Sequence, residues 1–207
     1  SAASDVYKRQ DLENAYRKAF STDPTSAFGG VIALNQKADS KVISSIMANQ
    51  FVEVLIAPDF DQEAINLLKN KKKIRVLKGD KFKQLTESYK YNSGVFLEQT
   101  DDNLNFEKIK LESNTKAKPD SNDINDLLFA MKVAKHVKSN AIVIAKDEMT
   151  LGIGAGQMSR VISTKIAFMK AKEEKLDVKD CVLASDAFFP FRDNIDIAAS
   201  EGVKHII

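Results

Sequence analysis

Residues 51–58 read Phe-Val-Glu-Val-Leu-Ile-Ala-Pro, a mostly apolar run that a proline ends. Such a short run is typical of a buried strand. Helical spacing of apolar residues flanks it at about 40–49 and 62–71, and further apolar strands are expected at 31–34 and 74–77. Strands that alternate with helices in this way predict an α/β fold with mixed, mostly parallel sheets and covering helices.

Polar stretches divide the chain. Residues 1–10 are small and polar and have no convincing period, so we exclude them as an N-terminal scar or artefact. Apolar residues at helical spacing predict a short helix over 11–20. Residues 79–120 are rich in Lys, Asp, Asn and Glu, with one strand-like island at 94–97. We place a linker between two lobes at 101–123.

The alternation resumes after the linker. Four elements are expected there: strands at 141–145 and 182–184, and helices at about 124–134 and 158–174. A last strand at 203–207 stops in mid-pattern, so the chain looks incomplete. We therefore predict two alternating segments, 11–100 and 124–207, in a fold that is truncated at both ends.

The overall composition excludes several classes of protein. Lys and Arg number 31 against 29 Asp and Glu, so the net charge of +2 is too balanced to indicate a nucleic-acid partner. No run approaches the roughly 18 apolar residues of a membrane span. No N-terminal stretch looks like a signal peptide. We expect a cytoplasmic protein with no membrane partner.

Residues that often carry metal or thiol chemistry are scarce. Cys181 is the only cysteine, which excludes an internal disulfide and a cysteine-rich zinc site. With only His136 and His205 besides, we predict no metal. We expect Cys181 in the core, His205 in a structural role in the last strand and His136 exposed on its helix. The charge run Lys69–Lys73 is interpreted as a solvated helix end.

A glycine-rich segment, Gly152–Gly156, is expected to be a loop between a strand and a helix. Such a loop lets backbone N–H groups approach an anion. Its spacing matches neither the phosphate loop nor the dinucleotide fingerprint, because Gln157 stands where the third glycine should be. A tight structural turn and a ligand loop both stay open. Arg160, one turn into the helix, could reach back to pair with a carboxylate or phosphate.

The segment Ser185–Asp193 reads Ser-Asp-Ala-Phe-Phe-Pro-Phe-Arg-Asp and follows a predicted strand. Its aromatic, acidic and basic side chains suit a flat heterocycle with polar edges at the carboxyl end of a sheet. The alternative is a hydrophobic plug. We expect Asp193 to be the N-cap of a helix at 193–201, with Asp196 in a capping box and Gly202 just past its end.

Asn140 lies at a helix-to-strand junction. Its side-chain amide both donates and accepts hydrogen bonds, which suits recognition of a carboxamide. A left-handed turn residue is the alternative interpretation.

Three long motifs together carry a family resemblance. They are Ser21–Gly30 (Ser-Thr-Asp-Pro-Thr-Ser-Ala-Phe-Gly-Gly), Lys138–Ala141 running on to Gly152–Arg160, and Ser185–Asp193. In this order they resemble the bacterial bifunctional purine biosynthesis family, which joins AICAR formyltransferase to IMP cyclohydrolase. The resemblance covers about residues 11–207.

The resemblance implies the formyltransferase half, which is built from two cytidine-deaminase-like α/β/α lobes. In that family the 5-amino group of AICAR, an aminoimidazole carboxamide ribonucleotide, attacks the formyl group of 10-formyltetrahydrofolate. The product closes to IMP in the other domain. The implied partners are AICAR, a reduced folate and a second copy of the chain, since the site is shared across a homodimer in the cytosol.

Six positions match the family's binding residues. Asn140, Arg160 and Phe188 match contacts to the nucleotide, while Val161 and Asp193 match contacts to the folate. Gly30 stands where animal relatives have a substrate-binding aspartate, so only a backbone contact is implied there.

The family's catalytic Lys-His pair should lie just before residue 11, and Ser1–Gln10 do not resemble it. Loss of such a proton acceptor costs about 10²–10⁴-fold in rate, so we expect this chain alone to be inactive or nearly so. A different class, a stand-alone nucleotide-binding module that reuses the Gly152 segment, is the alternative. A nicotinamide-dependent oxidoreductase is disfavoured by the glycine spacing.

Overall fold

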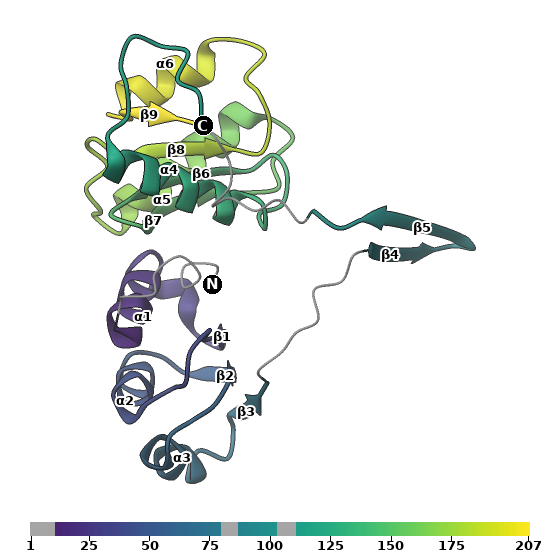
Figure 1. Cartoon of the computed structure of the whole chain (residues 1–207), viewed down its shortest axis with the longest axis vertical. Helices are drawn as coiled ribbons and strands as arrows, with labels where there is room; N and C mark the ends of the chain where they lie inside the picture. The colour runs from purple at the N-terminus through teal and green to yellow at the C-terminus, as the bar shows by residue number, and fades with distance from the viewer. Residues whose placement is uncertain (1–10, 80–86, 103–110) are drawn as a thin grey trace.

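A computed structural model of the chain describes residues 11–79, 87–102 and 111–207. The described strands form three sheets: β1-β2-β3, the hairpin β4-β5, and β7-β6-β8-β9 (Figure 1). The predicted α/β class with mixed sheets is confirmed. We call residues 11–79 the first unit and residues 111–207 the second unit.

The first unit is a parallel sheet with helices beside it. Its elements are α1 (Leu12–Ser21), the short 3₁₀ helix η2 (Thr25–Ala27), β1 (Gly30–Ala33), α2 (Ser40–Asn49), β2 (Val52–Ala57), α3 (Gln62–Lys69) and β3 (Arg75–Lys78). Each α-helix begins after an aspartate, Asp11, Asp39 or Asp61, whose carboxylate accepts a hydrogen bond from a backbone N–H of the first turn. Both crossovers step the same way along the sheet, so the right-handed rule places α2 and α3 on one face.

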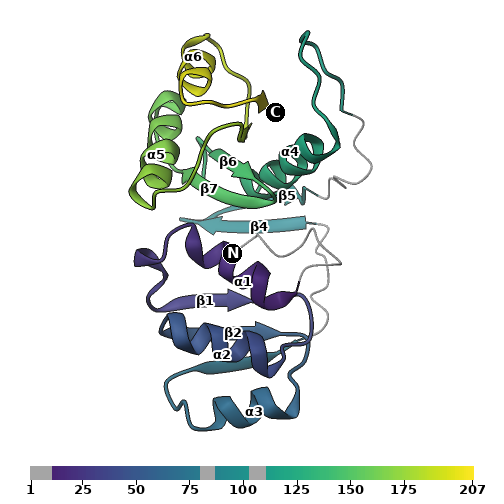
Figure 2. The ribbon, with the colours of Figure 1, turned by 90° about the vertical axis from the view of Figure 1, so that its left-hand side faces the viewer.

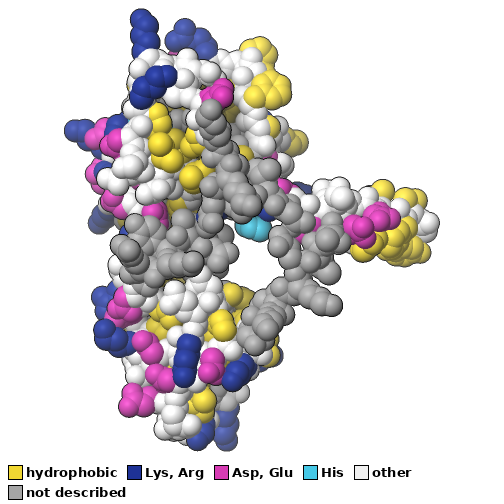
Figure 3. Space-filling view, viewed as in Figure 1, with side chains coloured by type: hydrophobic (Ala, Val, Ile, Leu, Met, Phe, Trp, Pro, Cys, Tyr) yellow, Lys and Arg dark blue, Asp and Glu magenta, His cyan; other side chains and the backbone are white. Residues whose placement is uncertain are grey.

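The hairpin consists of β4 (Glu87–Asn92) and β5 (Val95–Thr100), which pair antiparallel. Ser93 and Gly94 between them both have positive φ, as a two-residue hairpin turn requires. Only β5 overlaps the predicted island at 94–97, because β4 is too polar to be found by apolar patterning. Tyr91 and Phe96 are more than half exposed, and hydrophobic side chains gather on the hairpin in Figure 3.

The second unit is a sheet between two helical layers. Its elements are α4 (Ser121–Ala134), β6 (Ile142–Lys146), β7 (Met149–Gly154), α5 (Arg160–Glu173), β8 (Val182–Ser185), α6 (Asp193–Ser200) and β9 (His205–Ile206). Alternate residues of β6 serve two cores. Val143 and Ala145 pack on the α4 side, whereas Ile142 and Ile144 pack on the α5 side. Helix α4 begins at Ser121, so the last three residues of the expected linker are helical.

Strand β6 pairs antiparallel with both β7 and β8, while β8 and β9 are parallel. The pairing in this sheet is therefore more antiparallel than the alternation predicts. The cause is the hairpin between β6 and β7, which turns at Asp147 and Glu148, both with φ of 53°. This hairpin places a strand where the sequence predicts a loop.

The two units touch through α1 and the β6–β7 hairpin, which lie side by side in Figures 1 and 2. The Thr22 hydroxyl Oγ1 donates to the Thr150 carbonyl at 2.7 Å, and Lys18 Nζ donates to the Asp147 carbonyl at 2.7 Å. Asp23 and Lys170 form an ion pair at 3.2 Å. Polar contacts thus join the units at the outer edge of the second sheet.

The cysteine, the two histidines and the charge run at 69–73 lie where the sequence predicts. Cys181 is fully buried, and its burial raises the pKa of the thiol to about 12. His136 is exposed, as are the lysines of Lys69–Lys73. His205 lies in β9 with Nε2 3.2 Å from Asp123 Oδ2, which fits a structural role. Among the described residues, no helix combines the length and apolar character needed to cross a bilayer.

Candidate functional site at one edge of the second sheet

The register of the second sheet brings three distant segments to one edge. Ile142, at the start of β6, pairs with Gly154 at the end of β7 and with Ser185 at the end of β8. Because β6 is antiparallel to β7 and to β8, the residues that precede β6 lie beside the residues that follow β7 and β8. The segments that the sequence singles out, 138–141, 155–160 and 185–193, therefore meet.

Asn140 is held on both sides of its peptide. Its backbone N–H and its side-chain Nδ2 donate to the Gln157 carbonyl at 3.3 and 2.7 Å, and its own carbonyl accepts from Ser163 Oγ at 2.8 Å. The peptide bond from Ser139 is cis. Asn140 has no positive φ, so its interpretation as a left-handed turn residue is wrong. Within the described chain, its side-chain oxygen Oδ1 has no hydrogen-bond partner.

Arg160 is the first residue of α5 and reaches across to the end of β8. Its Nε donates to Ser185 Oγ at 3.0 Å, and its Nη2 donates to Asp186 Oδ1 at 2.8 Å. Only 15% of the side chain is exposed. Arg160 thus pairs with a carboxylate of the chain itself, and its pairing with a carboxylate or phosphate of a ligand stays a prediction. Nη1 is left without a partner among the residues that the structure describes.

Asp186 joins all three segments. One carboxylate oxygen accepts from Arg160 and from the Ala141 N–H at 3.1 Å, while the other accepts from Ser139 Oγ. Burial alone would raise the pKa of this carboxyl, but the hydrogen bonds from Ser139, Arg160 and Ala141 hold it below its ordinary value. The sequence pointed to Asp186 only as one of the two aspartates of Ser185–Asp193 and gave it no role of its own.

The glycine segment is mostly strand. Gly152 and Gly154 belong to β7, so the prediction of a loop over 152–156 is wrong for its first half. A Cβ at Gly152 would lie 2.0 Å from the Ala167 carbonyl oxygen, and one at Gly154 would lie 1.8 Å from that of Ser163. These glycines let α5 pack directly on β7, a role that neither open interpretation named. Only residues 155–159 form a loop.

The aromatic segment packs only in part into the core, so its interpretation as a hydrophobic plug holds for one ring. Phe189 packs on the α5 side of the core, whereas Phe188 and Phe191 are 81% and 72% exposed. The two exposed rings stand free to contact a ligand or partner surface.

The predicted cap of α6 is shifted by one residue. Arg192 is the N-cap and Asp193 is the first helical residue, with Oδ1 accepting from the Asn194 N–H at 2.8 Å. Asp196 forms no capping box, because its carboxylate pairs with both Nε and Nη2 of Arg192 at 2.9 Å. Gly202 follows the helix with φ of 95°, as predicted. Asn194 is buried and accepts from Thr164 Oγ1 at 2.8 Å, which ties α6 to α5.

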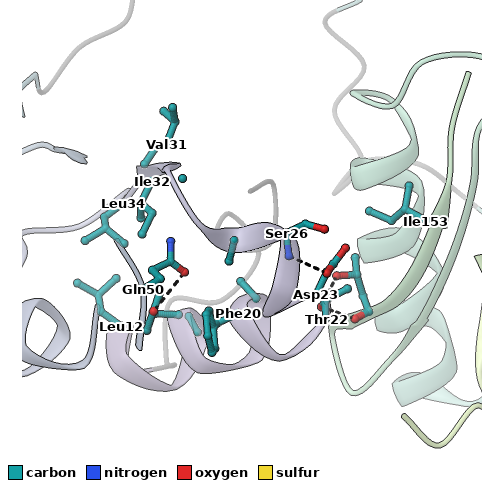
Figure 4. Close-up of a pocket in the computed structure, with 17 residues that line it drawn as sticks. Leu12, Phe20, Thr22, Asp23, Ser26, Val31, Ile32, Leu34, Gln50 and Ile153 are labelled. Atoms are coloured by element: carbon teal, nitrogen blue, oxygen red, sulfur yellow. Dashed lines mark hydrogen bonds between the residues drawn. The ribbon is translucent and has the colours of Figure 1, made fainter. Parts of the chain in front are cut away.

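Five of the six predicted site residues lie along this edge and one does not. Val161 follows Arg160 in the first turn of α5 and is half-buried. Gly30 instead begins β1 in the first unit, where a Cβ would lie 2.8 Å from Gln50 Nε2. It lines a mainly apolar cavity of about 320 Å³ between α1, β1 and β7 (Figure 4). In the described part of the chain, no group of three or more His, Cys, Asp or Glu could hold a metal ion.

Comparison with known proteins places this geometry in context. Residues 2–170 match the family model described as the AICARFT/IMPCHase bienzyme, a range that includes most of the ten residues set aside above. The chain is 50% identical over 196 residues to the bifunctional purine biosynthesis protein PurH of Xanthomonas axonopodis pv. citri (strain 306). That alignment covers 94% of this chain and 37% of the relative, so the chain spans little more than a third of that protein.

Proposed function

This chain belongs to the AICARFT/IMPCHase bienzyme family, and we propose from that membership that it carries part of an AICAR formyltransferase of purine biosynthesis. In the proposed reaction, the 5-amino nitrogen of AICAR attacks the formyl carbon of 10-formyltetrahydrofolate. The bond from that carbon to the folate nitrogen breaks, and one proton passes from the amine to the folate. The whole protein would also carry IMP cyclohydrolase activity.

The observation that carries the proposal is the meeting of Asn140 and Arg160 at one sheet edge in a chain of this family. The free Oδ1 of Asn140 suits the N–H groups of a carboxamide. The remaining Nη1 of Arg160 suits an anionic or carbonyl oxygen. Phe188 offers an exposed aromatic face on which a flat heterocycle can stack. AICAR has all three features.

The folate, as formyl donor, is proposed to contact Val161 and Asp193. Both lie beside the nucleotide residues, at the start of α5 and of α6. Gly30 is proposed to contribute its backbone only, from the other unit. No metal is assigned to the reaction.

The proposed organisation follows the same resemblance. Residues 11–100 and 124–207 would be parts of two cytidine-deaminase-like lobes, with 101–123 between them. The Lys-His pair that accepts the proton would lie outside these residues. The site would be shared across a homodimer in the cytosol, and the 207-residue chain alone would be inactive or nearly so.

Isothermal calorimetry of AICAR with the full-length gene product tests the nucleotide assignment. Arg160→Ala should weaken binding by about 10- to 100-fold, because it removes charge-assisted hydrogen bonds. Arg17→Ala is the matched control, since Arg17 is an exposed arginine on α1 whose partner is Glu13. Equal affinity of the Arg160→Ala chain and the unchanged chain would contradict the assignment. Formyl transfer by the full-length gene product separates an enzyme from a binding module, which would bind without turnover.

A further inference from the structure

The side chain of Asp186 is nearly enclosed and fully engaged. It is 16% exposed, and its two oxygens accept from Ser139 and Ala141, just before β6, and from Arg160 at the start of α5. Asp186 is not among the residues proposed to touch the nucleotide or the folate. Its partners, however, are Arg160 and the residues on both sides of Asn140.

The contacts of Arg160 show what this engagement does. An arginine side chain has about 2 kcal/mol of rotamer entropy, and ordering it before a ligand arrives removes that cost from binding. Nε is fixed by Ser185 and Nη2 by Asp186, two adjacent residues at the end of β8. Two anchors on one planar group fix the direction of the third nitrogen, Nη1.

The same carboxylate restrains Asn140 from both sides. It accepts from the Ser139 hydroxyl before Asn140 and from the Ala141 N–H after it. Gln157 and Ser163 hold Asn140 from the β7–α5 side. The free groups of the arginine and the asparagine are therefore set relative to each other through one side chain.

We propose that Asp186 is a positioning residue for nucleotide binding, which holds Arg160 and Asn140 in the relative geometry that the nucleotide requires. This inference rests on the proposed function, because it assumes that these two residues contact AICAR. Asp186 itself need not touch the ligand. A purely structural role would stabilise the fold without coupling to Arg160 in the kinetics.

The test is a double-mutant cycle of Asp186→Asn and Arg160→Ala in the full-length gene product, with KM and kcat measured for both substrates. The asparagine is nearly the same size and still accepts hydrogen bonds, but it cannot form the ion pair. Asp186→Asn should raise KM for AICAR by about 10- to 100-fold, as for a misplaced binding group. KM for 10-formyltetrahydrofolate should stay within about twofold. The two effects should be clearly less than additive in the double variant, because the part of the Asp186→Asn effect that acts through Arg160 is already lost in Arg160→Ala.

Glu13→Gln is the matched control, since it removes an Arg–carboxylate pair, with Arg17 on the surface of α1, and should leave KM unchanged. Thermal unfolding identifies a variant that fails to fold. If Asp186→Asn does so, Ser139→Ala removes one donor to the same carboxylate at an exposed residue and should raise KM for AICAR several-fold.

The outcomes distinguish a failure of the positioning role of Asp186 from a failure of the proposed nucleotide site. If Arg160→Ala raises KM for AICAR and Asp186→Asn does not, the positioning role is overturned and the proposed function stands. Additive effects in the cycle, or an unchanged KM in Ser139→Ala where that variant is needed, also overturn it. If Arg160→Ala leaves KM for AICAR unchanged, the proposed nucleotide site itself fails.

Discussion

All four residues of β8 in the second unit are buried, whereas all four residues of β3 in the first unit are exposed. The difference follows from strand order and layering. Strand β8 lies between β6 and β9, whereas β3 is at the edge of the described β1-β2-β3 sheet. Both crossovers of the first unit step the same way, so the right-handed rule places α2 and α3 on one face of that sheet. In the second unit, α4 and α5 pack on opposite faces. The candidate site lies on the sheet that is held from both sides.

The largest effect that tests this contrast is expected from one substitution made in both sheets. Leu183 in β8 is fully buried, whereas Leu77 in β3 is 51% exposed. Leu183→Ala should lower the free energy of unfolding by about 2–5 kcal/mol through the cavity it leaves. Leu77→Ala should cost about 0.5 kcal/mol or less. Urea unfolding followed by circular dichroism measures both, and equal losses would show that the outer face of the first sheet is covered.

A smaller effect is expected from adding one methyl group to a glycine in each unit. At Gly154 the new Cβ would meet the Ser163 backbone oxygen at 1.8 Å, so α5 must move. At Gly30 the nearest atom, at 2.8 Å, is the end of the flexible Gln50 side chain. Gly154→Ala should destabilise the chain by about 1–3 kcal/mol or more, and Gly30→Ala by less. A Gly154→Ala chain that melts at the temperature of the unchanged chain would mean that α5 does not rest on β7.

The smallest expected effect concerns charge. Asp123 in the second unit accepts from Lys204 Nζ at 2.8 Å and from the Asp120 N–H at 3.0 Å. Burial alone would raise the pKa of its carboxyl, yet these hydrogen bonds hold that pKa below its ordinary value. The unfolded chain therefore takes up the proton first. The resulting stabilisation is present above about pH 3.8 and is lost as the pH falls through the lower pKa of the folded state.

Asp123→Asn should cost about 1–3 kcal/mol at neutral pH and should flatten the acid side of the stability curve. Asp59 in the first unit is the comparison. The pKa of Asp59 is also lowered, chiefly by Lys78, but the pair is exposed and screened by salt. Urea unfolding across acidic to neutral pH measures Asp123→Asn and the matched variant Asp59→Asn, which should change the stability less. An acid limb that persists in Asp123→Asn would assign the pH dependence to other groups.

Much of the first unit was predictable from the sequence. Helix α2 spans the expected residues 40–49, and β2 matches its apolar run to within one residue. Apolar spacing is a local property, and in this unit local spacing and tertiary packing agree. Strand β4 was missed because its residues are polar, and β7 was missed because its glycines resemble a loop.

The candidate site was predictable only in pieces. Asn140 and Arg160 followed from chemistry and from the family resemblance. The part played by Asp186 did not, because it depends on β6 lying antiparallel between β7 and β8. That register cannot be read from any one segment. Gly30 matched the family motif, but the structure places it in the other unit.

The contact of Thr22 with Thr150 has a consequence for solubility. Strand β7 is an edge strand, and an open edge can recruit a strand from another molecule. Thr22 donates to the carbonyl oxygen of Thr150 in β7, and Lys18 donates to that of Asp147 in the turn before β7, so α1 lies against this edge. Helix α1 thus protects the second unit, which contains the candidate site, from aggregation through β7. The second unit prepared without the first would expose the β7 edge to pairing with other molecules.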